Sequence, residues 1–242
     1  MPKFSIIIPT KNEQEHLPVL LESIRAQSFR DYEVIVADAG SDDRTREIAV
    51  AFGAQVTGGG LPGPGRNRGA EAASGDILIF FDADVKLPSA GFLEDCWHEM
   101  EYKKLDLATC RVMPLSVRHI DRALHEAYNA YALATEKIRP HAPGFCIFIR
   151  RNAHLGIKGF DEDVVMAEDH DYVQRAAEKG YRFGILRSHP IGVSVRRLEK
   201  DGRLSIALKY IFVEMRMMTT GSLKGDMPFK YEMGGKSAGN IK

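Results

Sequence analysis

Acidic side chains follow three apolar segments of this 242-residue chain, each near the point where the segment ends. They are Glu13 after the run 4–9, Asp38 after the run 32–37, and Asp82 and Asp84 after the run 76–81. In an open α/β sheet, ligands bind beyond the carboxyl ends of the strands, so these side chains would lie around one crevice. Carboxylates gathered at one edge repel one another unless a cation lies among them. Mg²⁺ or Mn²⁺ is the expected cation, because both take oxygen ligands and bridge phosphates.

The pattern Asp82-Ala83-Asp84 is the most informative of these. In an extended segment, residues i and i+2 point to the same side, so both carboxylates could address one metal-bound diphosphate. Short patterns of this kind match often by chance, and solvated acids at a strand end are the alternative interpretation. The position directly after the apolar run 77–81 favours the functional interpretation.

The elements that must position these residues alternate between apolar strands and amphipathic helices. Strands are expected over 4–9, 32–37, 54–57, 76–81, 107–112, 146–149 and 181–186. Helices are expected around 17–24, up to Gly53, up to Ala73 after a glycine and proline loop at 58–65, and over 92–100, 120–134, 169–179 and 204–218. Three alternations in the first third indicate a parallel sheet covered on both faces, which defines an α/β fold.

Composition describes one globular domain, with 44% apolar and 27% charged residues and no dividing linker. Basic and acidic residues number 33 each, so no global field recruits nucleic acid or an anionic membrane. The charge is uneven, however, because residues 196–242 contain ten basic and five acidic side chains. Cys96, Cys110 and Cys146 form no CxxC pair, which argues against a disulfide framework and favours a reducing cytoplasm. No apolar run approaches the roughly 20 residues that a spanning helix needs.

Four segments together resemble a family 2 glycosyltransferase of the GT-A fold. They are SIIIPTKNE at 5–13, DAGSDDRT at 38–45, GRNRGAEAASGDILIFFDAD at 65–84 and AEDHDY at 167–172. The resemblance implies a Rossmann-like, mostly parallel sheet flanked by helices. It also implies an inverting hexosyltransferase that uses a nucleotide-diphosphate sugar and a bound Mg²⁺ or Mn²⁺.

The resemblance assigns donor binding to residues of the first three segments: Pro9, Thr10, Asn12, Glu13, Asp38, Arg66 and Asp82. Asp38 would accept a base N–H, and Arg66 would lie near the base or the diphosphate, since an arginine fork complements phosphate oxygens. Asp84 would ligate the metal directly, and Asp82 would contact ribose or sugar and could share the metal. His189 falls where some relatives offer a further metal ligand, with a structural or exposed histidine as the alternative.

Asp169 is the expected catalytic base, again by resemblance. It would remove a proton from the acceptor hydroxyl as that oxygen attacks the anomeric carbon. The alternative is that Glu168, Asp169 and Asp171 are first-turn acids favoured by the helix dipole. A lipid phosphate acceptor would already be ionised, and Asp169 would then orient it instead.

The expected organisation is a single domain over 1–242 in three parts. Residues 1–112 form the nucleotide-binding half, 113–195 the acceptor and catalytic-base half, and 196–242 a basic, helical C-terminal appendage. Expected partners are a nucleotide-diphosphate sugar and a saccharide or lipid-linked acceptor, without nucleic acid. The stripe Leu204, Leu208, Ile211, Met215 and Met218 with its basic neighbours could contact the inner face of a membrane. The alternative is a C-terminal helix that packs on the body of the protein and leaves its basic residues solvated. A nucleotidyltransferase and a non-catalytic sugar-nucleotide binding protein are the alternatives.

Overall fold

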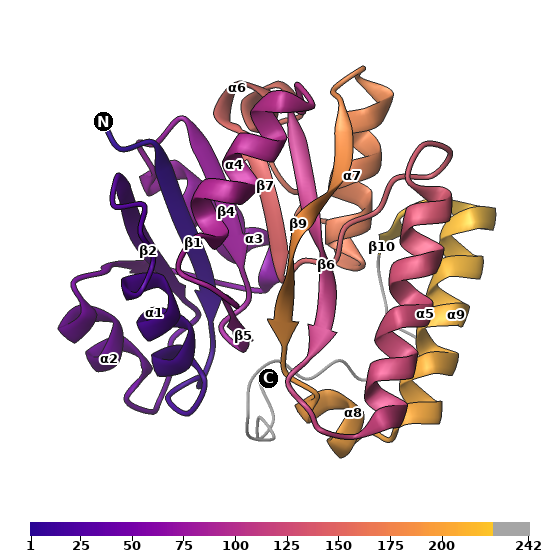
Figure 1. The fold of residues 1–242 in the computed structure, drawn as a ribbon, viewed down its shortest axis with the longest axis horizontal. Helices are drawn as coiled ribbons and strands as arrows, with labels where there is room; N and C mark the ends of the chain where they lie inside the picture. Colours follow the sequence, from indigo (N-terminus) through magenta and orange to yellow (C-terminus); the bar gives the residue numbers. More distant parts are fainter. Residues whose placement is uncertain (225–242) are drawn as a thin grey trace.

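The computed structural model describes residues 1–224; expectations for residues 225–242 and for the side chain of Met218 lie outside the described residues. An eight-stranded sheet has the order β3-β2-β1-β4-β7-β6-β9-β5 (Figure 1). Its strands are β1 Phe4–Thr10, β2 Tyr32–Asp38, β3 Gln55–Gly58, β4 Ile77–Phe81, β5 Val85–Lys86, β6 Leu107–Pro114, β7 Cys146–Arg150 and β9 Phe183–Val193. The four strands β3, β2, β1 and β4 are parallel to one another, whereas β7 runs antiparallel to β4 and β6. The predicted α/β class, with a mostly parallel sheet, is confirmed.

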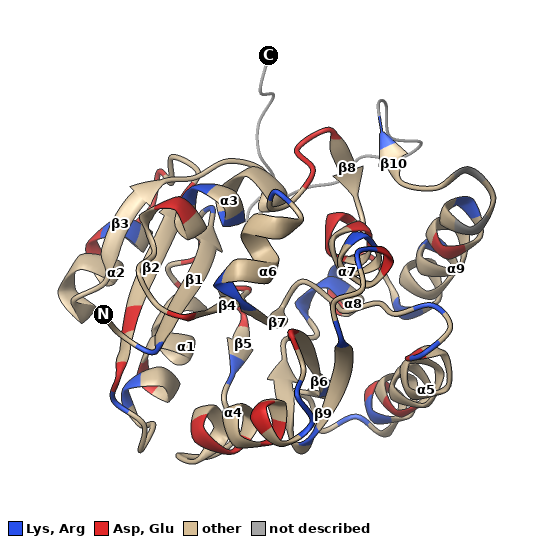
Figure 2. Ribbon diagram, turned by 90° about the horizontal axis from the view of Figure 1, so that it is seen from above, with Lys and Arg blue, Asp and Glu red and all other residues tan. Residues whose placement is uncertain are grey.

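Helices cover both faces of the sheet (Figure 2). One face carries α1 Leu17–Arg25, α2 Thr45–Phe52 and α4 Phe92–Tyr102, and the other carries α3 Pro62–Ala72, α6 Arg151–Gly156 and α7 Glu168–Glu178. Side chains alternate between the faces along each strand. In β1, Ile6 and Ile8 belong to the core cluster under α1, and Ile7 belongs to the cluster under α3. The strands are therefore apolar throughout because both faces are buried.

Two further helices lie side by side beyond β6 and β9 (Figure 1). They are α5 His119–Thr135 and α9 Arg203–Thr220, which follows the short α8 Arg196–Lys200; β8 Val164–Met166 and β10 Leu223–Lys224 form a small antiparallel pair. Arg203 donates two hydrogen bonds of 2.6 and 2.9 Å to the buried Asp121, which lowers the pKa of Asp121 to about 2. No helix among residues 1–224 combines the length and the apolar character needed to cross a bilayer.

The helix α3 begins at Pro62, earlier than the predicted loop over 58–65 allows. Proline is favoured in the first helical turn, where its missing N–H costs no hydrogen bond. The glycines serve close packing as well: a Cβ at Gly69 would overlap Ile7 Cγ2, and one at Gly65 would lie 3.3 Å from Pro9 Cβ. The glycine side of α3 therefore lies directly on β1.

The Asp82-Ala83-Asp84 segment also differs from the prediction. β4 ends at Phe81, and Ala83 and Asp84 lie in a turn that leads into β5. The extended register that would point both carboxylates the same way is therefore wrong, because the chain must turn here to bring β5 beside β9. β9 also extends to Val193, well beyond the predicted end at residue 186.

Replacing Gly69 with alanine tests the close approach of α3 to β1. Alanine normally stabilises a helix interior relative to glycine by roughly 0.5–1 kcal/mol. Here the added methyl overlaps Ile7, so we expect the free energy of unfolding to fall by about 1–3 kcal/mol in chemical denaturation. Glu71→Ala on the exposed side of α3 is the control and should stay within about 0.5 kcal/mol of the parent. A Gly69→Ala protein as stable as the parent would contradict the packing.

Candidate active site

The loops after β1 and β2 form one joined rim at the carboxyl edge of the sheet. Thr10 and Asp38 are register partners at the ends of these strands, and Thr10 Oγ1 donates a 3.0 Å hydrogen bond to Asp38 Oδ2. Asn12 lies in the left-handed region with φ 54°. Its side-chain Oδ1 accepts a hydrogen bond from the backbone amide of Asp42 at 2.9 Å, and its backbone amide donates to Ser41 Oγ at 2.8 Å. The predicted donor residues Thr10, Asn12 and Asp38 are therefore brought together.

Asp38 organises the turn that follows β2. Its Oδ1 accepts the amides of Gly40 and Ser41 at 3.1 and 2.9 Å, and its Oδ2 accepts the Ser41 hydroxyl at 2.6 Å. The carboxylate is almost fully buried. In this arrangement Asp38 shapes the loop, and its contact with a nucleotide base remains a prediction.

A buried guanidinium lies at the centre of the second group of predicted residues. Arg66 is only 2% exposed, and it donates to Asp82 Oδ1 at 2.8 Å and to Glu168 Oε1 at 2.7 Å. It also donates to the carbonyl of Gly144 at 3.2 Å, and its guanidinium carbon lies 5.4 Å from the Phe160 ring centre. Burial alone would lower the pKa of Arg66, but Asp82 and Glu168 raise it above its usual value. The arginine therefore stays charged.

Gly144 connects Arg66 to Asp169. Its amide donates a 2.5 Å hydrogen bond to Asp169 Oδ2, while its carbonyl accepts from Arg66. A Cβ at this position would overlap Arg66 Nη2 and would lie 3.2 Å from Asp169 Oδ2, so a larger residue would have to displace the buried Arg66 side chain. The pairing of Phe81 with Cys146 places the start of β7 beside the end of β4, which brings Gly144 next to Asp82.

We call Arg66, Asp82, Gly144, Glu168 and Asp169 the Arg66 cluster. Two of its members, Glu168 and Gly144, are not predicted from the sequence as site residues. The sequence marks Glu168 only as a neighbour of Asp169, and Gly144 carries no signal beyond following a proline. Burial raises the pKa of Glu168, the adjacent Asp169 raises it further, and Arg66 opposes both. The cluster thus joins residues of the predicted donor and acceptor halves around one positive charge.

A second ion cluster involves Glu13, Asp84 and Arg196, and we call it the Arg196 cluster. Arg196 donates to both carboxylate oxygens of Glu13 at 2.8 Å, and its Nε lies 2.8 Å from Asp84 Oδ2. Burial raises the pKa of Glu13 and that of Asp84, and Arg196 opposes the rise in both. Sequence reasoning missed Arg196 as a site residue, since its only signal was its place at the start of the basic C-terminal part.

His189 is not brought to these acids. Its Nε2 lies 2.7 Å from Asp95 Oδ2 of α4, and its ring centre lies 6.1 Å from that of Phe92. Within residues 1–224, no three His, Cys, Asp or Glu side chains are grouped to hold a metal. The oxygens of Asp82 and Asp84 are nevertheless the ligand type that Mg²⁺ and Mn²⁺ prefer. Each of these acids is held by an arginine, Asp82 by Arg66 and Asp84 by Arg196, so a metal at either acid would take the place of an ion pair.

Aromatic and histidine side chains adjoin Asp169 on the side of α5 and α9. The His141 ring centre lies 5.1 Å from that of Tyr131 and 5.2 Å from that of His170. His170 Nδ1 lies 3.0 Å from Glu214 Oε1 of α9; burial lowers the pKa of His170, but Asp169 and Glu214 raise it overall. Tyr128 Oη and His141 Nε2 are buried without a hydrogen-bond partner in the described chain. This side therefore offers polar atoms next to Asp169.

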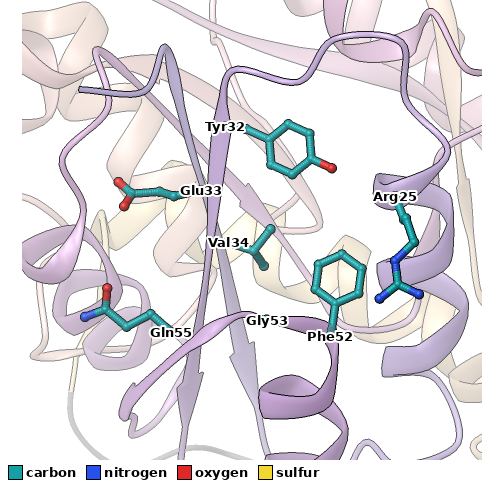
Figure 3. Close-up of a pocket in the computed structure, with 7 residues that line it drawn as sticks. All are labelled: Arg25, Tyr32, Glu33, Val34, Phe52, Gly53 and Gln55. Carbon is teal, nitrogen blue, oxygen red and sulfur yellow. The ribbon is translucent and has the colours of Figure 1, made fainter.

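A separate hollow lies at the opposite edge of the sheet (Figure 3). It is lined by Arg25, Tyr32, Glu33, Val34, Phe52, Gly53 and Gln55, and Tyr32 begins β2. The Arg25 guanidinium carbon lies 4.6 Å from the Phe52 ring centre. None of the predicted site residues lines this hollow, so it stays apart from the candidate active site.

Replacing Arg66 with methionine tests the Arg66 cluster. The change leaves Asp82 and Glu168 without their shared cation, so we expect a loss of about 3–5 kcal/mol in unfolding free energy at pH 8. The loss should be smaller at pH 5, because the Glu168 carboxyl, whose pKa is raised in the folded state, takes up a proton more readily there.

The measurement is chemical denaturation at both pH values, with Arg68→Met as the matched control. Arg68 is exposed on the same helix and donates only to the carbonyl of Gly59, so its loss should cost within about 0.5 kcal/mol. Equal stabilities of the two variants would argue against a central role for Arg66.

Solved structures of similar fold are glycosyltransferases. Staphylococcus aureus TarS in complex with UDP-GlcNAc matches with a TM-score of 0.64 and 21% identity, over 79% of this chain and 58% of that one. A mannosyltransferase from Pyrobaculum calidifontis in complex with GDP-Man and Mn²⁺ matches with a TM-score of 0.68 and 20% identity, over 87% of this chain and 64% of that one. The predicted GT-A fold is confirmed by these likenesses.

Curated relatives match a shorter part of the chain. A 4,4'-diaponeurosporenoate glycosyltransferase from Staphylococcus haemolyticus is 43% identical over 99 residues, which are 37% of this chain and 26% of the relative. A GalNAc(5)-diNAcBac-PP-undecaprenol beta-1,3-glucosyltransferase from Campylobacter jejuni is 34% identical over 98 residues, 37% of this chain and 32% of the relative. The match thus spans about a third or less of these relatives.

Residues 5–155 match the family described as "Glycosyl transferase family 2". The chain therefore belongs to glycosyltransferase family 2, as its sequence predicted.

Proposed function

We propose that this protein transfers a sugar, with inversion, from a nucleotide-diphosphate sugar to an acceptor hydroxyl or a lipid phosphate, using Mg²⁺ or Mn²⁺. The observation that carries the proposal is the Arg66 cluster. One buried guanidinium contacts Asp82 of the DxD segment and Glu168 beside Asp169. The residues proposed for the donor and the residue proposed as base are thus held at one place, although 87 positions separate Asp82 from Asp169.

The donor half, residues 1–112, would bind the nucleotide along the joined rim. Pro9, Thr10, Asn12 and Asp38 would face the base and ribose, and Arg66 would attract the diphosphate. Asp82 would contact ribose or sugar, and Asp84 would hold the metal together with diphosphate oxygens. A bound divalent ion would stabilise the negative charge that develops on the leaving diphosphate. The Mn²⁺ that accompanies GDP-Man in the Pyrobaculum mannosyltransferase supports a metal of this kind.

The acceptor half, residues 113–195, would supply the base. Asp169 Oδ2 is oriented by the amide of Gly144, and a carboxylate held in this way can accept a proton from an attacking hydroxyl. Inversion requires only one displacement, so no side-chain nucleophile is needed. Tyr128 and His141, with their unpartnered polar atoms, would face acceptor hydroxyls. With a lipid phosphate acceptor, Asp169 would orient the phosphate and remove no proton.

A lipid-linked acceptor is favoured by the outer face of α9. Leu204, Leu208, Ile211 and Met215 are 74, 57, 56 and 60% exposed, and their spacing places them on one stripe of the helix. Both views place α9 at the outer edge of the molecule (Figures 1 and 2). An apolar stripe within a basic segment suits the interface of an anionic membrane. Peripheral contact through 196–224, on the cytoplasmic side, is part of the proposal.

Two substitutions separate donor binding from transfer. Thermal stabilisation by UDP-, GDP- and dTDP-sugars, with and without Mn²⁺, identifies the donor, because a ligand of the folded state raises its stability. Asp84→Ala should remove the Mn²⁺-dependent part of that stabilisation. Asp169→Asn should keep it and lower transfer to a hydroxyl acceptor by roughly 10²- to 10⁴-fold.

Asp163→Asn, an exposed acid near α7, is the control and should retain both properties. Undiminished turnover in the Asp169→Asn protein would remove the base assignment. Unchanged Mn²⁺-dependent stabilisation in the Asp84→Ala protein would remove the metal assignment.

Cosedimentation with anionic liposomes tests the membrane contact. The parent protein should sediment with vesicles that contain phosphatidylglycerol, and Leu208→Glu combined with Ile211→Glu should abolish this, because charge on the stripe opposes insertion. Val50→Glu changes a comparably exposed apolar residue on α2 and should leave sedimentation unchanged. Equal sedimentation of the parent and the double variant, or none by the parent, would end this part of the proposal.

A further inference from the structure

Arg196 joins three loops at the carboxyl edge of the sheet. Its fork donates to Glu13 of the β1–α1 loop through two bonds of 2.8 Å, and its Nε lies 2.8 Å from Asp84 Oδ2 in the β4–β5 turn. Arg196 itself begins α8, directly after β9. The positive charge therefore lies between two carboxylates that come from distant parts of the chain.

The backbone around Arg196 is tied to the same turn. The Ser194 amide donates to the carbonyl of Asp84 at 3.1 Å, and the Arg196 amide donates to Ser194 Oγ at 3.2 Å. Val193 pairs with Val85 in the strand contact just before. The guanidinium is thus delivered to Asp84 by a short, hydrogen-bonded segment.

Glu13 and Asp84 need a cation because they are largely withdrawn from water. Their side chains are only 7 and 20% exposed, and Arg196 contacts both, while Arg197 and His16 add positive charge near Asp84. A divalent ion held by Asp84 would use carboxylate oxygens as ligands, and Arg196 already contacts one of them. The two cations therefore compete for the same acid.

We propose that Arg196 is a positioning residue that occupies the cation position between Glu13 and Asp84 until metal and nucleotide diphosphate bind together. The proposal rests on the donor-binding function described above. An arginine fork binds phosphate oxygens as well as carboxylates, so the incoming diphosphate offers Arg196 a new partner as it leaves Asp84. Metal alone brings no such partner, so its binding in the absence of donor is weakened by Arg196.

Calorimetric titration with MnCl₂ alone, without nucleotide, tests this role. Arg196→Ala should bind Mn²⁺ roughly tenfold more tightly than the parent, because the charge-assisted contact of Arg196 with Asp84 no longer opposes the metal. Arg196→Lys keeps a charge without the fork and should fall between them. A merely structural role predicts the reverse, since acids that lose their tether are less well placed. Mn²⁺ affinity that is equal to or weaker than that of the parent in Arg196→Ala overturns the proposal.

Arg203→Ala is the matched control, because Arg203 anchors the same C-terminal segment to Asp121 without touching Glu13 or Asp84. Its Mn²⁺ affinity should equal that of the parent; an equal gain in both variants would show that loosening α9 suffices and would overturn the role of Arg196. Hydrogen exchange of the unaltered protein gives a second measurement: Mn²⁺ with the donor identified by thermal shift should change protection at 194–200, and unchanged protection counts against the proposal.

The two proposals fail in different ways. Mn²⁺ binding of equal strength in the parent, Arg196→Ala and Arg203→Ala removes the competition by Arg196 and leaves metal-dependent transfer intact. Absence of Mn²⁺ binding in every variant, with and without nucleotide sugar, removes both.

Discussion

The candidate active site depends on one buried positive charge. Arg66 is almost wholly withdrawn from solvent, and a guanidinium in that position is tolerated only when acids and carbonyls satisfy it. Asp82, Glu168 and the carbonyl of Gly144 do so, and the face of Phe160 covers it. The glycine side of α3 lets the helix lie close enough to β1 to hold Arg66 at this depth. Packing, charge and the proposed chemistry therefore share a single cause.

The acidic side chains at the carboxyl edge of the sheet are paired with two arginines that differ in their surroundings. Arg66 comes from a helix that packs on β1, and it is buried on all sides. Arg196 comes from the segment after β9, and its side chain remains 32% exposed. The first arginine is fixed by its surroundings, whereas the second can change partners at little steric cost. The contrast fits the exchange proposed for Arg196, whereas Arg66 would act on the diphosphate from a fixed place.

Much of the fold could be predicted because its strands are strongly patterned. β1, β2 and β4 were expected within a residue or so, since their apolar runs are short, continuous and bounded by turn residues. The start of α3 could not be predicted in this way. Its first turns contain two prolines and two glycines, which sequence patterns associate with loops. Proline is in fact favoured in the first helical turn, and the close approach of Gly65 to Pro9 shows that the helix packs directly on β1. The turn at Ala83 and Asp84 likewise follows from the distant pairing of β5 with β9.

The sequence singles out the acids of the candidate site and Arg66, but not the contacts between them. Local pattern and family resemblance single out Asp82, Asp84 and Asp169, but the partners come from far along the chain. Glu168 is 102 residues from Arg66, and Arg196 is 183 residues from Glu13. No spacing rule reaches over such separations without an alignment or a structure.

Gly144 has a consequence for any attempt to alter this protein. One peptide unit on each side of its Cα touches the two halves of the site, with the carbonyl on Arg66 and the amide on Asp169. Arg66 and Asp169 are thus bridged at this point by the backbone of a single residue. A substitution that shifts Arg66 will therefore also be felt at Asp169, the proposed base, through the one residue that contacts both.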